Sequence, residues 1–358
     1  MNSSSQRDYR DDAACTFDVS TFFITTLSVI SLASIVGNIF VITAVYRTPV
    51  LRTSTNYYYV NMAVSDIIFC LMTWPFFLTG KIFISKGSAN EVSMVTYACK
   101  TSSYLRMASY SVSLGSLVLI AVDRFVATVY PFKVYLLSRK LRAVLISTTW
   151  LFSLSSCFPF FFFSSVYSGG ELSYCKYWRN GKTTVIVISV GIIFATFAPL
   201  CTIIILYQRI MRVLQRKPIQ ESSAQGSNPV QWRNKTRRKT MYLFILIVAV
   251  FFVCWIWPYV ILVLEIFSPE LFLKDHCHWI DSFAFIVFPT LSTVMNPIIL
   301  FSLSSRFRDA LPTCTLLPIS CKPCCRARSL SPYQSREGPV HLVAMKTLQS
   351  LNFFKQSL

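Results

Sequence analysis

Seven long apolar stretches constrain what this chain can fold into more than any other feature of its sequence. Each has roughly the 20 residues that an α-helix needs to cross the hydrocarbon core of a bilayer. Inside that core, a helix satisfies its backbone N–H and C=O groups within its own segment. We therefore predict an all-α membrane protein, a seven-transmembrane helix bundle over residues 22–303. The predicted spans are residues 22–46, 57–80, 95–128, 143–166, 183–207, 240–264 and 279–303.

The amino-acid composition agrees with this class of protein. Of the 358 residues, 54% are hydrophobic and only 14% are charged, which is outside the usual balance of soluble globular domains. Charges gather in one span, the third, which holds Lys100, Arg106, Asp123 and Arg124. A hydropathy window alone is therefore expected to rate this span the weakest of the seven.

Basic residues orient the predicted bundle. Lys and Arg are retained on the cytoplasmic side of a membrane, and here they are concentrated in the loops that share a side with the C-terminus. We expect a multi-pass plasma-membrane protein with residues 1–21 outside and the tail, 314–358, inside. Topology and attraction to anionic membrane lipids then explain the net charge of +19 without a nucleic-acid partner. In residues 304–313, Phe307 and Leu311 are four residues apart with Arg306 and Arg308 on the other side, which favours a short amphipathic eighth helix.

The cysteines divide by side of the membrane. Cys99 and Cys175 face an oxidising compartment, where they could form a disulfide, and Cys15 and Cys277 are a second candidate pair. Asn2 begins a usable exterior glycosylation sequon. The cysteines after the eighth helix are candidates for lipidation; a zinc site is the alternative, although two well-formed CxxC knuckles are lacking. These tail cysteines are Cys314, Cys321, Cys324 and Cys325.

A carboxylate lies in the middle of the second span. An ionisable group inside a span costs about 2.5–3.5 kcal/mol on insertion scales, so it indicates a function or a paired interior. The cluster that Asp66 forms with polar residues at comparable depth could hold a Na⁺ ion, and we expect no other metal or cofactor. The alternative is a hydrogen-bonded knot that ties helices together. The residues at this depth are Asn38, Ser113, Ser292 and Asn296.

Asp123 and Arg124 are adjacent near the predicted cytoplasmic end of the third span. Opposite charges here can pair locally, and release of the arginine would then be a two-state event coupled to helix movement. The alternative is an interfacial arginine that reaches toward the lipid headgroups.

Spaced motifs in all seven spans resemble those of rhodopsin-like (class A) G-protein-coupled receptors. In chain order, they are Gly37-Asn38 with Val41, Asn61-Met62-Ala63-Val64-Ser65-Asp66, Cys99, Ala121-Val122-Asp123-Arg124-Phe125, Trp150, Pro199, Tyr207, Phe252, Cys254-Trp255, Pro258, Asn296-Pro297 and Phe307. The resemblance implies that Arg124 engages a heterotrimeric G protein, that Cys99 is bonded to Cys175, that Asp66 lies in a sodium pocket, and that arrestin is a further partner. The implied coupling residues are Asp123, Arg124, Tyr207, Trp255, Trp257, Pro258 and Pro297.

Three positions depart from the family pattern. Phe125 replaces the usual Tyr after the Asp-Arg pair, a frequent substitution. The sixth span has one residue more between Cys254 and Pro258 than the family's CWxP, which leaves open whether Trp255 or Trp257 acts as the switch. Leu300 occupies the position of the Tyr in NPxxY, and so lacks a hydroxyl that helps to hold the active state in relatives.

Arg106 is the main sequence clue to the ligand. It is seven residues after Cys99, on the same helix face and directed at the expected pocket with Met107 and Tyr110. A buried guanidinium favours an anionic partner; the alternative is an internal pair, for which the candidates are Asp281 and Glu265.

Comparison with the family's motifs narrows the ligand class. Thr290 stands where opsins have the retinal-binding Lys, and Arg106 stands where amine receptors have Asp. We favour a peptide ligand, with an anionic lipid or a nucleotide as the alternative. A non-signalling decoy or scaffold stays open as another class, whereas a transporter is disfavoured because the halves show no internal repeat. An enzyme is disfavoured because no catalytic constellation is present.

Overall fold

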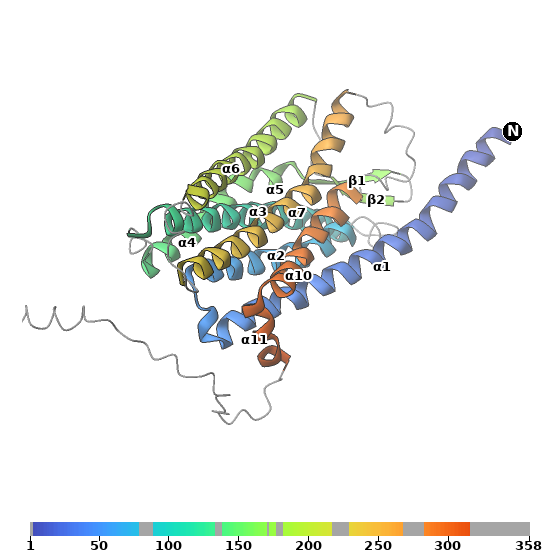
Figure 1. Ribbon diagram of the computed structural model, residues 1–358. Coiled ribbons are helices and arrows are strands. Elements are labelled where there is room, and N and C mark those ends of the chain that lie inside the picture. Colours follow the sequence, from blue (N-terminus) through green and yellow to red (C-terminus); the bar gives the residue numbers. More distant parts are fainter. Residues whose placement is uncertain are drawn as a thin grey trace, which may run out of the picture. The chain divides into compact units, whose positions relative to one another are not determined.

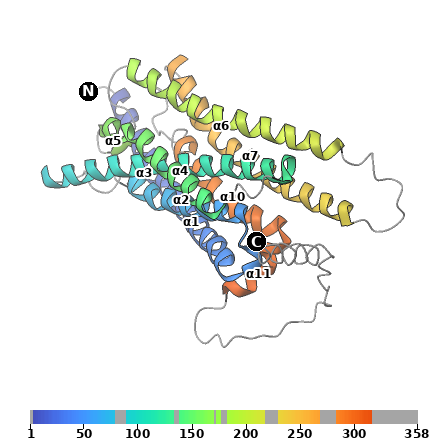
Figure 2. The same ribbon diagram turned by 90° about the vertical axis from the view of Figure 1, so that its left-hand side faces the viewer.

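The computed structural model describes residues 3–78, 89–132, 138–169, 172–176, 182–216, 229–267 and 283–315. Long helices dominate these residues and run side by side as a bundle (Figures 1 and 2). The structure confirms the predicted all-α bundle. Its elements are α1 (Ser3–Arg47), η1 (Pro49–Leu51), α2 (Ser54–Leu78), α3 (Ala89–Val129), α4 (Arg139–Cys157), α5 (Pro159–Phe163), β1 (Ser165–Gly169), β2 (Leu172–Lys176), α6 (Lys182–Arg216), α7 (Pro229–Phe267), η4 (Phe283–Val287), α10 (Phe288–Leu303) and α11 (Ser305–Thr315).

Helix α3 lies at the centre of the bundle. It packs against α2, α4, α5 and α6, while α1 packs between α2 and α10, and α10 packs against α7. Two glycines permit close approaches within this arrangement. A Cβ at Gly37 of α1 would lie 2.8 Å from Pro297 Cγ of α10, and one at Gly115 of α3 would lie 2.6 Å from Thr149 Cγ2 of α4.

Six helical segments within the described residues are long and apolar enough to cross a membrane, and α2 is not one of them. The expectation that the third span would rate weakest was therefore wrong. Helix α3 is one of the six segments because long apolar runs separate its charges. The most apolar stretch of α3 is more hydrophobic than those of α4 and α6. Helix α2 still belongs to the bundle because its polar residues are buried between neighbouring helices.

The fourth helix ends earlier than the predicted span 143–166. Helix α4 begins after Ser138, whose side chain accepts a hydrogen bond from Leu141 N at 3.2 Å, and it ends at Cys157. Pro159 then opens the short helix α5, because proline has no N–H to donate to a continuing helix. Strand β1 follows, so Ser165 and Val166 belong to a hairpin rather than to the span.

The hairpin and the amphipathic helix lie at opposite ends of the bundle (Figure 1). Strands β1 and β2 are antiparallel, with Val166 opposite Cys175. We call this end the hairpin end. Helix α11 follows α10 at the other end, where the buried Phe307 packs against Phe301 with 5.7 Å between ring centroids.

Candidate functional site

Asp66 is the centre of a fully buried hydrogen-bond cluster. Ser113 Oγ of α3 donates to Asp66 Oδ1 at 2.9 Å, and Asn296 Nδ2 of α10 donates to Asp66 Oδ2 at 2.8 Å. Ser113 is also 2.8 Å from Ser65 Oγ of α2. We call these four residues the Asp66 centre. Each carboxylate oxygen has a donor, which is how a buried charge is retained at tolerable cost.

The other two residues expected beside Asp66 bond to different partners. Asn38 of α1 donates to Ser34 O at 2.9 Å and to Thr293 O at 3.1 Å. Ser292 of α10 accepts a hydrogen bond from Trp255 Nε1 at 3.1 Å and donates to a carbonyl of its own helix. The five residues predicted at one depth therefore form three adjoining groups, all anchored on α10.

The two tryptophans of α7 have different surroundings. Trp255 is buried, with its ring 3.7 Å from that of Tyr110 and 5.8 Å from that of Phe69, measured between centroids. Trp257 is 41% exposed and stacks on Phe288 at 5.4 Å. Of the two tryptophans, Trp255 is the one that contacts buried residues of α2, α3 and α10.

Three hydroxyl groups meet next to Trp255. Tyr110 of α3 lies 2.7 Å from Thr196 Oγ1 of α6 and 3.0 Å from Tyr259 Oη of α7, and Thr196 also bonds to Tyr259. The Tyr110 ring stacks on Phe251 at 5.8 Å. This hydroxyl triangle connects three helices through side chains alone.

Arg106 is buried: its side chain is 1% exposed and is the largest of the fully buried side chains among the described residues. Its Nη2 donates to Phe285 O of η4 at 2.9 Å, and its guanidinium lies 5.0 Å from the Phe69 ring centroid. Met107 packs partly buried against the adjoining core. Helix η4 is a π-helix, a form that occurs often at functional sites.

The Asp-Arg pair lies at the other end of α3. Thr55 Oγ1 of α2 donates to Asp123 Oδ2 at 2.6 Å and accepts a hydrogen bond from Arg124 Nη2. Arg124 and Asp123 are themselves 3.8 Å apart. We call Thr55, Asp123 and Arg124 the Arg124 centre. The arginine is thus held toward α2 by a hydroxyl that no sequence motif had marked.

The remaining coupling residues lie on α6, α7 and α10. Tyr207 of α6 stacks on Phe244 of α7 with 4.9 Å between centroids, and Leu300 of α10 is buried in the same apolar core. Pro258 and Pro297 lie inside α7 and α10, where neighbouring helices can satisfy the backbone groups that proline leaves free.

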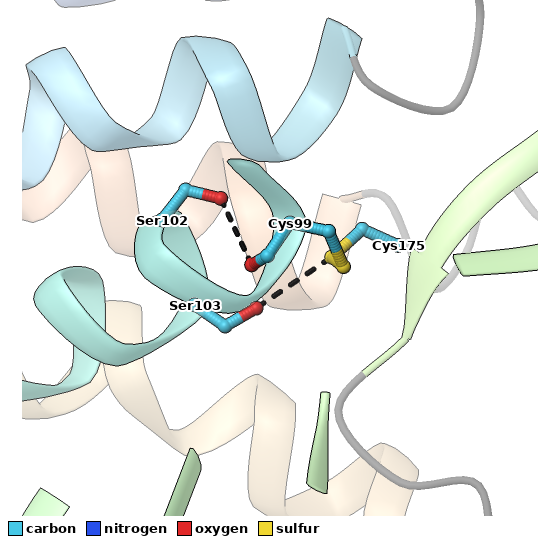
Figure 3. Close-up of a disulfide and its surroundings, with 4 residues drawn as sticks. All are labelled: Cys99, Ser102, Ser103 and Cys175. Carbon is cyan, nitrogen blue, oxygen red and sulfur yellow. Dashed lines mark hydrogen bonds between the residues drawn. A yellow bond between two sulfur atoms is a disulfide. The ribbon is translucent and has the colours of Figure 1, made fainter. Parts of the chain in front are cut away.

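The predicted disulfide between Cys99 and Cys175 is present and fastens strand β2 to α3 (Figure 3). Ser103 Oγ lies 3.6 Å from Cys175 Sγ, and Ser102 Oγ donates to Cys99 O at 3.1 Å (Figure 3). Arg106 follows two helical turns along α3, about 10 Å from Cys99 at the α-helical rise per residue.

Several predicted residues lie outside the described part of the chain. No group of three or more His, Cys, Asp or Glu that could hold a metal occurs within the described ranges. Asn2, Cys277, Asp281, Cys321, Cys324 and Cys325 lie outside these ranges, and so do the side chains of Cys15, Glu265 and Cys314.

Several hydroxyl-bearing residues of the site were not predicted from the sequence. Besides Thr55, these are Thr196, Tyr259 and Thr293, all buried between helices. The signal available was a polar side chain on the inner face of an otherwise apolar span, which marks a buried partner when a neighbouring helix carries one at similar depth. That signal gives depth but not the identity of the partner.

Comparisons with known proteins agree with the geometry. A family model described as "7 transmembrane receptor (rhodopsin family)" matches residues 37–300. The Substance-K receptor of Bos taurus is 28% identical over 285 residues, covering 78% of this chain and 71% of that receptor. The RYamide receptor of Drosophila melanogaster is 27% identical over 292 residues, covering 77% and 59%. "Probable G-protein coupled receptor 19" of Mus musculus is 29% identical over 234 residues, covering 63% and 52%.

Proposed function

The chain belongs to the rhodopsin family of seven-transmembrane receptors, and from this membership we propose that it transmits an extracellular peptide signal to a heterotrimeric G protein. Receptors of this family are not enzymes. The observation that carries the proposal is a chain of contacts: Arg106 lies over the Phe69 ring, Phe69 and Tyr110 both contact Trp255, and Trp255 donates to Ser292. It connects a buried cation near the hairpin end with three helices that continue to the Arg124 centre.

A peptide is the ligand class that both the relatives and Arg106 favour. Two relatives carry the names Substance-K receptor and RYamide receptor. Arg106 donates to a neutral backbone carbonyl, Phe285 O, and a carboxylate would accept a stronger, charge-assisted hydrogen bond in its place. A peptide carboxylate that reached Arg106 would therefore draw the guanidinium from η4. An anionic lipid or a nucleotide could offer the same charge and is the alternative ligand class.

Transmission through the bundle would proceed by exchange of contacts. Tyr110 belongs to the hydroxyl triangle and also contacts Trp255, so displacement of α3 at this level would alter the contacts of α6 and α7 together. Movement of α6 and α7 away from α3 would free Arg124 from Thr55 and Asp123 for the G protein. The coupled event is a two-state change in packing rather than a continuous deformation.

The Asp66 centre fits a sodium ion in the resting receptor. The carboxylate and the Ser113 and Ser65 hydroxyls are oxygen ligands of the kind that hard cations prefer. Raising Na⁺ at constant ionic strength should increase the thermal stability of the wild-type chain but not that of Asp66→Asn, which lacks the anionic ligand. Equal responses of the two proteins would contradict a sodium site here.

The proposed topology follows from the same assignment. The disulfide and hairpin face the exterior of the plasma membrane, with Asn2 on the same side, and the Arg124 centre and α11 face the cytoplasm. Arrestin and anionic lipids would be partners on that side. Lipidation of the tail cysteines would anchor α11, which itself contains Cys314.

The test is second-messenger output in cells that express the full chain. cAMP and Ca²⁺ are measured against pools of synthetic peptides, with lipid and nucleotide pools in parallel. A peptide response that Arg124→Ala abolishes would establish the function, and loss of that response in Arg106→Gln would support the anionic contact. Lys100→Gln is the matched control, because Lys100 is a cation on the same helix but is only half-buried. Silence of the surface-expressed chain toward all pools would favour the decoy alternative.

A further inference from the structure

Three buried polar atoms near the Arg124 centre have no hydrogen-bond partner among the described residues. They are the hydroxyl oxygens of Tyr59 and Tyr207 and the Nε of Arg124. Buried polar atoms in native proteins are nearly always paired, because leaving one unpaired costs its full desolvation penalty. Three such atoms in one region indicate a place where pairing differs between two arrangements of the helices.

The three atoms face the same part of the core. Tyr59 follows Thr55 by four residues on α2, so both side chains lie on one helix face, and Thr55 bonds to Arg124. Tyr59 and Tyr207 are both buried in one core cluster, within electrostatic range of each other and of the guanidinium. Leu300 of α10 belongs to the same core cluster and offers no polar atom.

Tyr207 also has room to move. A cavity of about 680 Å³ lies between α6 and α7, and its lining includes Tyr207, Met211 and Phe244. Contacts between these two helices are sparse compared with those of α3 and α2. Helix α6 can therefore shift against α7 without opening a well-packed interface, whereas Tyr59 is held on α2, the helix packed most extensively against α3.

We propose that Tyr59 is a positioning residue for the signalling state: when α6 and α7 rearrange, its hydroxyl pairs with that of Tyr207 beside Arg124, directly or through one water molecule. This inference rests on the proposed receptor function. Helix α2 thereby supplies the hydroxyl that α10 lacks because residue 300 is a leucine. The Tyr59 hydroxyl is unpaired in the resting state and paired in the signalling state. This pairing therefore stabilises the signalling state relative to the resting state.

Tyr59→Phe and Tyr207→Phe test the proposal, because each removes one hydroxyl and little volume. Receptor output is measured as basal and peptide-pool-stimulated cAMP and Ca²⁺ at matched surface expression. Each variant should lower the output about 5-fold, the ratio expected for loss of one hydrogen bond. The double variant should fall no further than either single variant, because both removals break the same pair.

A second measurement does not depend on signalling. Thermal unfolding of the purified full chain in detergent should show that Tyr59→Phe is as stable as wild type or more so, since an unpaired hydroxyl is removed from the resting state. Tyr242→Phe is the matched control: Tyr242 lies on α7 at the same end of the bundle but is 62% exposed, and its variant should change neither quantity. In the Tyr59→Phe background, Leu300→Tyr should restore output.

The outcomes separate this inference from the proposed function. Wild-type output equal to that of Arg124→Ala under every condition overturns the receptor function, and the unfolding measurement still decides whether the Tyr59 hydroxyl is paired at rest. Wild-type signalling with undiminished output from Tyr59→Phe overturns the inference alone. Additive losses in the double variant, or a lowered melting temperature of Tyr59→Phe, overturn it as well. If Leu300→Tyr overpacks the core and fails to reach the surface, the double-variant comparison remains decisive.

Discussion

The Asp66 centre and the Arg124 centre share helices α2 and α3 but differ in how completely their polar atoms are paired. At Asp66, both carboxylate oxygens accept hydrogen bonds from neighbouring helices. At Arg124, one guanidinium nitrogen and two nearby tyrosine hydroxyls lack partners within the described residues. A fully paired buried network holds helices in one arrangement, whereas a partly paired one leaves a second arrangement accessible. We infer from this difference that the Asp66 centre stabilises the bundle and that the Arg124 centre takes part in conformational change.

The largest expected effect is on the Asp66 centre. Asp66→Ala deprives Ser113 and Asn296 of their acceptor, and we expect the free energy of unfolding to fall by about 2–5 kcal/mol. Asp66→Asn is the control, because it retains one acceptor oxygen and should lose less. Thermal unfolding of the purified chain in detergent measures both. If Asp66→Ala were as stable as wild type, the contrast between the two centres would not hold.

The next effect concerns the packing that supports the Asp66 centre. A methyl group at Gly37 would meet Pro297, the residue after Asn296, at 2.8 Å. Gly37→Ala should therefore lower the free energy of unfolding by about 1–3 kcal/mol. Gly191→Ala should be neutral or slightly stabilising in the same assay, since a Cβ there has no atom within 4 Å and alanine favours a helix more than glycine does. Equal destabilisation of the two variants would contradict a specific role for the contact between Gly37 and Pro297.

Trp255 tests whether its contacts with Tyr110 and Ser292 carry the signal toward the Arg124 centre. Trp255→Phe removes the hydrogen bond to Ser292 and part of a buried ring, which should cost about 1–2 kcal/mol. We expect signalling to fall by about tenfold, whereas the same change at the half-exposed Trp257 should have a much smaller effect. Cell assays at matched surface expression distinguish them. A larger loss from Trp257→Phe would place the switch on the exposed side of α7.

The smallest effect is expected at Thr55, where a change should affect activity more than stability. Thr55→Val keeps the shape of the side chain but removes the hydroxyl that bonds Asp123 and Arg124. Basal signalling should rise by about 2–5-fold, corresponding to loss of a weak net hydrogen bond. Thr55→Ser keeps the hydroxyl and should behave as wild type. Reduced basal output from Thr55→Val would mean that Thr55 supports the signalling state instead.

The sequence predicted the bundle well because the bilayer imposes helix length and backbone pairing on every span. It also predicted that Asp66, Ser113 and Asn296 belong together, since depth in the membrane can be counted from each span's ends. Depth does not fix the rotation of a helix about its axis. For that reason Asn38 and Ser292 were placed beside Asp66, although the first bonds to Thr293 and the second to Trp255.

The residues that sequence reasoning did not identify share one property: their role depends on a partner from a distant helix. In the sequence, Thr55 and Tyr59 are polar residues of the second span that belong to no motif. Their role can be inferred only from their positions beside Arg124 and Tyr207. Residue spacing alone likewise could not decide whether Trp255 or Trp257 is the switch, because the sixth span has one residue more before Pro258 than the family's motif. The contacts of Trp255 with Tyr110 and Ser292 decide which ring is buried.

The disulfide between Cys99 and Cys175 bears on how long a ligand would stay bound. Cys175 lies opposite Val166 in the hairpin and packs against the apolar cluster that Phe23 and Leu27 of α1 form with Ile286 and Val287 of η4. One covalent link thus fastens the hairpin to α3. On the proposed function, a ligand near Arg106 would have to leave past the edge of this hairpin, because the disulfide would keep the hairpin from lifting as a flap. The residence time of such a ligand, and the duration of each response, would then depend on the edge of the hairpin.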